Sequence, residues 1–373
     1  MNLLFFQNII SPHQMPYIQY LPKMEGVDEV VVIVPEVNLG ERDALGWDAK
    51  RWLQTEGIRF VVAPSSDEVD RIIRNAVVNG KPSTVNQTWC LFSGINAFPE
   101  VAMWFRTSLK YEVKRGVITE PPYVYDHPLW QHAIRFALKD WRYVKYIDKI
   151  FVMGDEYLNY YRFWSKRWDV IPFMYCTKWK ERKENLNHNL NENLNQNEIL
   201  KVVYVGSLSH RKNVKCLIKA AMMLGENELR QMEIGIVGDG DEREALERMS
   251  EGLTINVRFY GTQPMETIPE MMEQFDVLVL PSFHDGWGAV VNEALTLGLY
   301  VICSDHCGAM MLLKDADKGL IFRSDNDKDL AAKIRICIQE REKIRKGAMR
   351  RIDWSRENIS GKAVASYFLS KLK

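Results

Sequence analysis

The sequence predicts an α/β protein of two domains, each a parallel sheet covered by helices on both faces. The chain has 373 residues, which is more than one hydrophobic core usually organises. Beyond residue 200, short apolar runs alternate with amphipathic stretches, the order typical of a doubly wound sheet. A near-repeat of Asn-Leu-Asn over 184–197 has the composition of a solvated linker and divides the chain almost in half. We therefore expect the domain boundary between about Phe173 and Leu200.

In the first half, apolar runs predict a series of strands that begins at the N-terminus. The segment Met1–Ile10 lacks a basic region and is interrupted by Gln7 and Asn8, so it indicates a first buried strand rather than a signal peptide. Further strands are predicted at Val30–Pro35, Phe60–Ala63, Trp89–Phe92, Val117–Thr119 and Lys149–Met153. Helices are predicted over 43–55, 67–79, 98–110, 129–143 and 156–165.

The second half alternates more regularly, which predicts a parallel sheet with ligands bound beyond the carboxyl ends of its strands. The predicted strands are Lys201–Val205, Glu233–Val237, Val257–Tyr260, Val277–Leu280 and Tyr300–Cys303. Predicted helices cover 213–224, 241–251, 266–275, 287–297 and 327–344, and the last segment, 356–373, is also expected to be helical.

The composition excludes several classes of protein. Lys and Arg together equal Asp and Glu at 49 each, so net charge gives no reason to expect a nucleic-acid partner. The six cysteines form no Cys-x-x-Cys pair, which favours buried, reduced thiols. The cluster Cys303, His306 and Cys307 lacks the spacing of a zinc site, so no metal is expected there. No apolar run reaches the roughly 20 residues that span a bilayer, and we expect a cytoplasmic location.

The segment 276–305 carries the strongest functional signal. A buried strand ends at Pro281 and Ser282, and Asp285 then precedes a Gly-Trp-Gly loop and Glu293. Gly286 and Gly288 allow a ligand to approach the backbone closely, and the start of the following helix can attract an anion. Two carboxylates for hydroxyl groups and N–H donors for a phosphate suit a nucleotide-sugar. The alternative is that Asp285 caps the helix and Glu293 is an exposed acid.

A basic turn follows the first strand of the second half. It runs from Gly206 to Asn213 and carries Arg211 and Lys212 just before a helix. Cations are unfavourable at a helix N-terminus, so their presence there favours a bound anion such as a diphosphate. The alternative is a solvated, basic start to the helix.

The acid-Gly-aromatic-Gly-x-x-x-x-Glu pattern, after an apolar strand that ends in Pro-Ser, resembles the donor-site signature of the retaining family 4 glycosyltransferases. The resemblance covers 200–340 and is loose over 1–173. It implies the GT-B fold, in which two Rossmann-like, doubly wound domains face each other across a cleft. The implied parts are an acceptor-side domain (1–173), a linker (174–199), a nucleotide-sugar donor domain (200–352) and a C-terminal helix (353–373) that returns to the first domain.

The resemblance also implies roles for single residues. Asp285 and the amides of Gly286, Trp287 and Gly288 would hold the donor sugar, and Glu293 the ribose. Lys212 matches the family's phosphate-binding Lys, while Ser207 replaces an Arg whose charge Arg211 would supply, and the first acid is usually Glu. Lys212 and Arg211 would stabilise the charge of the diphosphate leaving group. The remaining residues expected at the donor are Gly206, Gly238, Tyr260, Gly261 and Ser282.

The first half offers weaker candidates for contact with an acceptor. His13 and Gln14 follow the first predicted strand, and Glu120 ends another. His127 and His132 are weaker still. Basic and aromatic residues interleave over 135–183, and this pattern has two interpretations: a face that rests on anionic lipid, or a helix whose aromatic side chains fill the core.

These features predict a retaining glycosyltransferase that moves a hexose-type sugar from a UDP- or GDP-linked donor to a glycan or lipid-linked acceptor. The resemblance implies that no metal or other cofactor is needed, and a place in bacterial surface polysaccharide synthesis at the inner face of the membrane. Two alternatives stay open. One is a catalytically degenerate nucleotide-sugar binding or scaffold protein, which the Asp at 285 and the Ser at 207 favour. The other is a nucleotide-sugar epimerase, whereas a dehydrogenase would need a glycine fingerprint that is absent.

Overall fold

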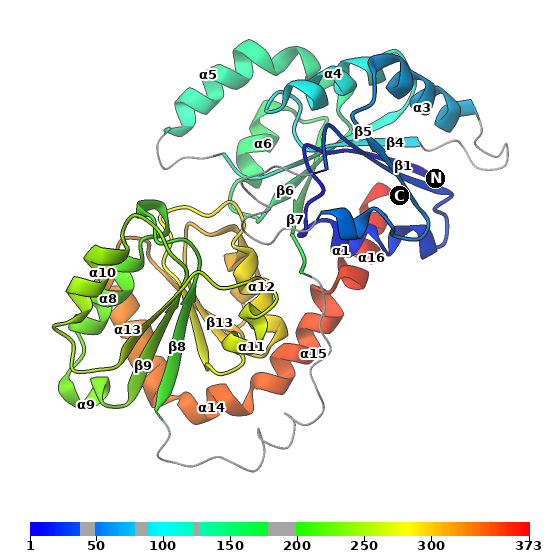
Figure 1. The fold of residues 1–373 in the computed structure, drawn as a ribbon. Helices are drawn as coiled ribbons and strands as arrows, with labels where there is room; N and C mark the ends of the chain where they lie inside the picture. The colour runs from blue at the N-terminus through cyan, green and yellow to red at the C-terminus, as the bar shows by residue number, and fades with distance from the viewer. Residues whose placement is uncertain (38–48, 79–87, 123–126, 178–198) are drawn as a thin grey trace. The chain divides into compact units, whose positions relative to one another are not determined.

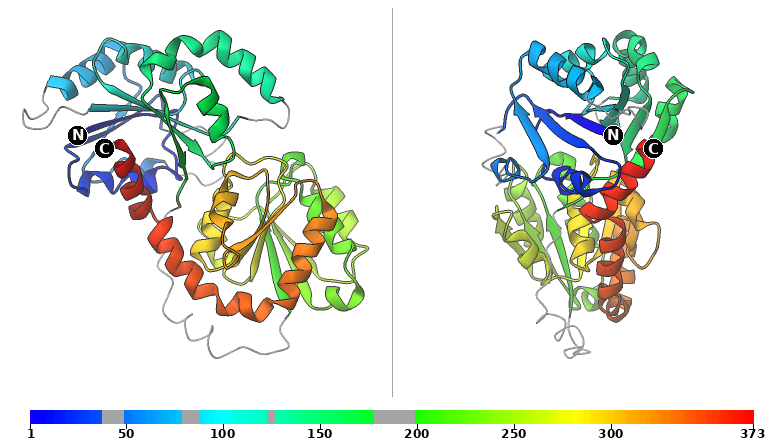
Figure 2. Two further views of the ribbon diagram at one scale, coloured as in Figure 1. Left: turned by 180° about the vertical axis from the view of Figure 1, so that it is seen from behind. Right: turned by 90° about the vertical axis from the view of Figure 1, so that its right-hand side faces the viewer.

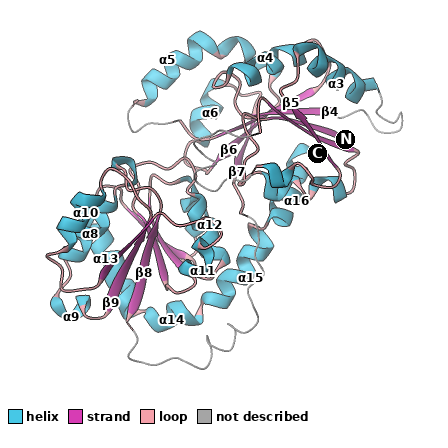
Figure 3. Cartoon of the chain, viewed as in Figure 1, coloured by secondary structure: helices cyan, strands magenta, loops and turns pink. Residues whose placement is uncertain are grey.

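The computed structural model describes residues 1–37, 49–78, 88–122, 127–177 and 199–373 (Figure 1). It divides into two compact units. The first comprises Met1–Lys178 together with Ser360–Lys373, and the second comprises Trp179–Ile359. Each unit is a parallel sheet between layers of helices, as the secondary-structure colouring of Figure 3 shows. Of the described helices, none combines the length and apolar character needed to cross a membrane.

The first unit is built on a seven-stranded parallel sheet of order β3-β2-β1-β4-β5-β6-β7. Its interior strand β1 is buried along its whole length because helices cover both faces of the sheet. The strands are β1 (Asn2–Phe6), β2 (Glu29–Val34), β3 (Ile58–Val62), β4 (Thr88–Phe92), β5 (Lys114–Thr119), β6 (Lys149–Met153) and β7 (Asp169–Phe173).

Helices α3 to α6 lie on one side of this sheet, and α1 and α16 on the other (Figures 1 and 2). On the second side, the ring of Phe368 in α16 packs 5.9 Å from that of Phe5 and 4.9 Å from that of Phe151. Described helical segments of this unit are α1 (Met15–Ile18), η1 (Leu21–Lys23), η2 (Lys50–Trp52), α3 (Ser66–Val78), α4 (Pro99–Ser108), α5 (Leu129–Lys139), η3 (Trp141–Tyr146), α6 (Leu158–Trp164) and α16 (Gly361–Leu372).

The second unit has a six-stranded parallel sheet of order β10-β9-β8-β11-β12-β13. Its strands are β8 (Leu200–Val205), β9 (Met232–Val237), β10 (Val257–Gly261), β11 (Val277–Leu280), β12 (Tyr300–Ser304) and β13 (Gly319–Phe322). Helices α8, α10 and α13 cover one face, and α11, α12 and α15 the other (Figure 1). The helical segments are η4 (His210–Lys212), α8 (Val214–Met222), α9 (Glu226–Leu229), α10 (Arg243–Ser250), α11 (Ile268–Met272), α12 (Ala289–Thr296), η5 (Gly308–Leu313), α13 (Asp327–Gln339), α14 (Arg341–Lys346) and α15 (Ala348–Asn358).

The predicted α/β class and parallel sheets are confirmed, and the differences lie in single elements. Strands β7 and β13 were not predicted. The helix predicted over 327–344 is two helices that meet at Glu340, and the one predicted over 356–373 is divided at Ile359 and Ser360. The division has a local cause, because the Ser360 hydroxyl accepts the Ala363 N–H and so begins a new helix. Most of the helix predicted at 43–55 lies outside the described residues, and the described part holds only η2.

Candidate active site

The residues predicted to bind a ligand in the second unit gather at one edge of its sheet. In chain order the strands are arranged 3-2-1-4-5-6, so the order reverses between β8 and β11. The basic turn (residues 206–213) follows β8, and the acidic loop (residues 285–288) follows β11. Both therefore lie at the carboxyl ends of the strands that flank this switch point. In open α/β sheets, this is where ligands bind.

An ion pair joins the basic turn to the acidic loop. The ammonium group of Lys212 donates to Oδ2 of Asp285 in direct contact, although the two residues are 73 positions apart. The side chains keep 16% and 13% of their surface exposed, so the pair is shielded but can still be reached from solvent. Breaking such a pair leaves a poorly solvated charge, and both residues are therefore sensitive positions.

Arg211 reinforces the same connection. Its Nη1 donates to the carbonyl of His284 at 2.9 Å and lies 4.0 Å from Oδ1 of Asp285. The backbone also closes the contact, since the Phe283 N–H donates to the Arg211 carbonyl at 2.9 Å. Both cations of the turn thus lie beside the carboxylate of Asp285.

The loop that follows β12 is hydrogen-bonded to the acidic loop. The N–H of Asp285 donates to the His306 carbonyl at 3.0 Å, and the Gly308 N–H donates to the Asp285 carbonyl at 3.1 Å. The Cys307 thiol donates to the Trp287 carbonyl at 2.9 Å. The backbone of the acidic loop is therefore held by hydrogen bonds to the loop after β12, which preorganises it for a ligand.

Two glycines at this site, Gly288 of the acidic loop and Gly308 of the loop after β12, are required by the local geometry. Gly288 has φ +89°, and a Cβ there would lie 2.6 Å from Sγ of Cys307 and 2.8 Å from Cδ2 of Leu280. The buried Gly286 carbonyl lies 2.5 Å from where a Cβ on Gly308 would be. Gly288 also occupies the N-cap of α12, so Asp285 does not cap this helix. That leaves the Asp285 carboxylate to the two cations.

Trp287 contributes packing rather than a ring surface for a ligand. Its side chain is buried and its Nε1 donates to Oδ1 of the buried Asn292 at 2.7 Å. Ser282 is also buried, and its carbonyl accepts the Ser304 hydroxyl at 2.6 Å. Glu293 follows at the start of the second turn of α12 and is half-buried. The prediction that Glu293 contacts a ribose stays a prediction.

The turn after β8 and the loop after β9 touch through their glycines. A Cβ on Gly238 would lie 1.9 Å from the Gly206 carbonyl oxygen, so only glycine fits at this contact. The Gly238 N–H donates to the Gly261 carbonyl at 2.8 Å, which links the next strand end. Ser207 is exposed, and the carbonyl of half-buried Tyr260 accepts Nε2 of Gln263 at 2.8 Å. These predicted residues therefore lie at the carboxyl ends of three adjacent strands, β8, β9 and β10.

Two titratable groups next to the ion pair are shifted toward their neutral forms. Burial lowers the pKa of His284 below its ordinary 6.5, and the cations Arg211 and Lys212 add to this, while Asp285 opposes it. Burial also raises the pKa of Tyr204 strongly, helped by the charge of Asp285. The Tyr204 hydroxyl donates to the Ser207 carbonyl at 2.8 Å and so braces the basic turn. Neither His284 nor Tyr204 was predicted from the sequence.

The candidates of the first unit meet around a residue that was not predicted, Tyr175. Its hydroxyl donates to Oε1 of Glu120 at 3.2 Å, and its ring lies 6.0 Å from that of His13. Gln14 is buried, and its Oε1 accepts Nε2 of Gln7 at 2.5 Å, which is a contact within the core. His13 and Glu120 are thus brought together, while Gln14 serves the packing of this unit.

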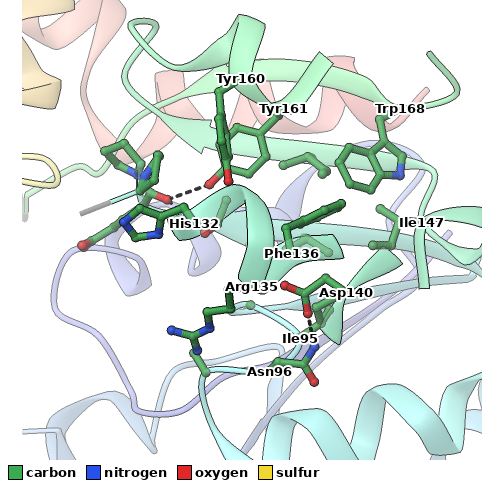
Figure 4. Close-up of a pocket in the computed structure, with 18 residues that line it drawn as sticks. Ile95, Asn96, His132, Arg135, Phe136, Asp140, Ile147, Tyr160, Tyr161 and Trp168 are labelled. Atoms are coloured by element: carbon green, nitrogen blue, oxygen red, sulfur yellow. Dashed lines mark hydrogen bonds between the residues drawn. The ribbon is translucent and has the colours of Figure 1, made fainter. Parts of the chain in front are cut away.

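Glu120 also borders a cavity of about 370 Å³ within the first unit (Figure 4). Phe136, Tyr160 and Trp168 form apolar walls, and His132 lies at the same cavity. The other weak candidate, His127, lies on the surface with its Nδ1 3.2 Å from Oε1 of Gln131. The chemistry of this lining, apolar with a few polar groups, is that of a small-molecule pocket.

All six cysteines are described, buried and free. Cys303 and Cys307 lie beside each other beneath the acidic loop, and hydrogen bonding to Cys307 and burial raise the pKa of the Cys303 thiol. Over the part of the chain that the structure describes, no three His, Cys, Asp or Glu side chains are grouped so as to hold a metal ion.

Comparison with known proteins places this site within a family. The family model described as "Glycosyl transferases group 1" matches residues 185–351. This region of the chain belongs to the group 1 glycosyltransferases. The matched region contains the basic turn, the acidic loop and Glu293. The predicted resemblance to glycosyltransferases of this group is therefore confirmed.

Two curated relatives that match part of the chain are named as glycosyltransferases. An α-1,4-N-acetyl-D-galactosaminyltransferase of Campylobacter jejuni, named for an undecaprenol-PP-linked substrate, is 33% identical over 37% of this chain and 38% of its own length. The alpha-D-kanosaminyltransferase of Streptomyces kanamyceticus is 30% identical over 39% of each chain. The chain thus matches less than two-fifths of the length of these relatives.

The similarity of fold extends over the whole chain. The structure of Anabaena HepE in complex with UDP has a TM-score of 0.71 at 16% identity, covering 100% of this chain and 99% of that one. The lipopolysaccharide outer core galactosyltransferase WaaB has a TM-score of 0.66 at 15% identity, with both chains covered completely. The predicted GT-B class of fold is confirmed.

Proposed function

We propose that the protein is a retaining glycosyltransferase that moves a hexose-type sugar from a nucleotide-sugar to a hydroxyl group of a glycan or lipid-linked saccharide. The observation that carries the proposal is the contact of Lys212 and Arg211 with Asp285 at the switch point of the second sheet. Two cations, a carboxylate and a glycine-containing loop thus lie at the carboxyl end of one sheet, inside the region that matches the group 1 family. A nucleotide-sugar offers a diphosphate to the cations and hydroxyl groups to the carboxylate.

The second unit would be the donor domain and the first unit the acceptor side. Lys212 and Arg211 would contact the diphosphate, with Gly206, Ser207 and Gly238 forming the wall of the phosphate site. Asp285 and the amides of Gly286, Trp287 and Gly288 would hold the sugar, and Glu293 the ribose. Tyr260, Gly261 and Ser282 complete the strand ends beside the base and sugar. In the first unit, His13 and Glu120, joined through Tyr175, are the acceptor candidates.

The chemistry follows from these positions. The bond between the anomeric carbon and the diphosphate oxygen breaks, and a bond from that carbon to the acceptor oxygen forms on the same face. The acceptor's proton passes to the departing diphosphate, so no protein base is required. Negative charge that develops on the leaving group is stabilised by Lys212 and Arg211, which are held beside it before the reaction begins.

Several relatives support the biological setting. The Campylobacter relative is named for a polyprenyl-diphosphate-linked acceptor, and an Escherichia coli relative as an O-antigen chain mannosyltransferase. The corresponding proposal for this chain is bacterial surface polysaccharide synthesis with a UDP- or GDP-linked donor. HepE, similar over the whole chain, was solved with UDP-glucose, which makes UDP-glucose a suitable first donor to test.

A thermal-shift screen of UDP- and GDP-sugars followed by product analysis tests this function. A donor at 100 times its dissociation constant adds about 2.7 kcal/mol of apparent stability, which is readily measured. Mass spectrometry should then find the sugar joined to an acceptor, with activity retained in EDTA. Tight donor binding without transfer would instead support a scaffold, and a changed donor without any acceptor product would support an epimerase.

A further inference from the structure

Helix α5 of the first unit carries an apolar row that faces away from the protein. Trp130, Ile134 and Leu138 recur every fourth residue, so they lie on one face of the helix. Their exposed fractions are 61%, 52% and 79%, and Trp141 at the start of η3 extends the row with 59%. Large apolar side chains exposed in a continuous row mark a surface that contacts something else.

The packing of α5 against its own unit does not use this row. On the inner side, the ring of Phe136 lies 4.6 Å from that of Trp164 and 5.7 Å from that of Trp168. At the end of the helix, Asp140 accepts a hydrogen bond from Asn96 (Figure 4). The inward side is therefore apolar and anchored, and the outward row is an additional apolar face.

Positive charge borders the row. Between Leu129 and Tyr146 the basic residues are Arg135, Lys139, Arg142 and Lys145, and all four are exposed. The acid of that stretch, Asp140, is turned toward Asn96 and only partly exposed. The whole chain has a formal charge of +0, so this positive surface is a local feature.

We propose that the outer α5 face, defined as Trp130, Ile134, Leu138 and Trp141 with the four basic residues beside them, docks on the surface of an anionic lipid bilayer. An amphipathic helix that lies in the plane of a membrane inserts its apolar row among the acyl chains and directs its cations to lipid headgroups. Tryptophan at both ends of the row suits the interfacial region.

Charge favours lipid over a second copy of the chain as the occupant. A symmetric dimer would place the same patch of each copy face to face, so four cations would oppose four cations. An anionic bilayer neutralises the same cations. The lipid contact concerns the first unit alone and does not depend on the function proposed for the second unit.

Vesicle flotation of the full chain, without nucleotide, tests the proposal. The protein should float with phosphatidylcholine vesicles that contain phosphatidylglycerol, should float poorly with phosphatidylcholine alone, and should be released as salt rises. The pair Ile134→Glu and Leu138→Glu should lower binding at least about ten-fold. As a matched control, Met222→Glu and Met223→Glu replace residues of the second unit that are also exposed, by 46% and 41%, and should leave binding unchanged.

A second pair separates charge from apolar contact. Lys139→Glu with Arg142→Glu should weaken binding to anionic vesicles. The control pair, Arg230→Glu with Arg248→Glu, replaces exposed cations of the second unit and changes the net charge by the same amount, and it should leave vesicle binding unchanged. Absence of binding to anionic vesicles, equal binding to neutral ones, or equal loss in the control variants would overturn the proposal. Concentration-dependent self-association that the Ile134→Glu and Leu138→Glu pair abolishes, without vesicle binding, would assign the face to a second copy instead.

Discussion

Lys212 and Asp285 form a direct ion pair between the turn after β8 and the loop after β11. The contact couples the part of the second unit that would bind a diphosphate to the part that would bind a sugar. Because each side chain keeps less than a fifth of its surface exposed, the pair holds both charges in a defined place before a ligand arrives. Preorganised charge of this kind stabilises charge that develops during a reaction.

Replacing Lys212 with Ala should lower the turnover of sugar transfer at least about ten-fold, equivalent to about 1.4 kcal/mol of lost stabilisation of the leaving group. Lys215→Ala, an exposed lysine on α8, is the matched control and should retain full turnover. Steady-state rates with saturating donor measure the effect. Wild-type turnover in the Lys212 variant would remove this residue from the mechanism.

The Glu293→Ala variant should bind the nucleoside diphosphate about ten-fold more weakly, because the hydrogen bonds that the ribose hydroxyls would donate to the carboxylate are lost. Titration calorimetry gives the affinity directly. Glu273→Ala, which removes a carboxylate at the end of α11, serves as the control and should bind as the wild type does. If both variants bind equally well, the ribose role of Glu293 is wrong.

Gly288→Ala should destabilise the second unit by roughly 1–3 kcal/mol, because alanine tolerates φ +89° poorly and its Cβ would overlap Sγ of Cys307. Gly252→Ala places a Cβ where nothing lies within 4 Å, and its effect should stay within about 0.5 kcal/mol. Urea unfolding followed by fluorescence compares the two. Similar midpoints for both variants would show that the loop does not require glycine.

The stability of the protein should fall as pH drops below about 6.5, in part through His284. Burial lowers the pKa of the folded imidazole below its ordinary 6.5, so the unfolded chain takes up a proton first as pH falls. The contribution of His284 to the free energy of unfolding is therefore complete above pH 6.5 and is lost as pH falls through the lowered pKa. Melting temperatures at pH 7.5 and 5.5 should differ less in His284→Gln than in the wild type; an unchanged difference would contradict this.

The strands predicted from sequence were those whose burial leaves a continuous apolar run. Val277–Leu280 is predicted and found with the same bounds. It is an interior strand, paired with β8 and β12, and all four of its residues are buried, so its sequence is a continuous apolar run. The two strands that were missed, β7 and β13, are edge strands of their sheets. The β7 sequence contains Pro172, which cannot donate to a sheet, and β13 begins with Gly319; both signals argue against a strand although an edge position tolerates them.

The candidate site was predictable as a set of residues but not as a set of contacts. Spacing placed Asp285 and Lys212 at strand ends, and the sheet order then brought them to the same edge. That their side chains touch depends on the path of both loops, which no local pattern specifies. The same holds for Tyr175, whose link between His13 and Glu120 joins segments more than 50 positions apart. Burial of His284 and Tyr204 likewise depends on distant packing.

The most direct test of the central claim compares nucleoside mono- and diphosphates in calorimetry with the wild type and Lys212→Ala. If the turn after β8 binds the diphosphate, the wild type should prefer the diphosphate, and the variant should lose most of that preference while its affinity for the monophosphate changes little. Equal losses for both ligands, or no nucleotide binding by the wild type, would contradict the account.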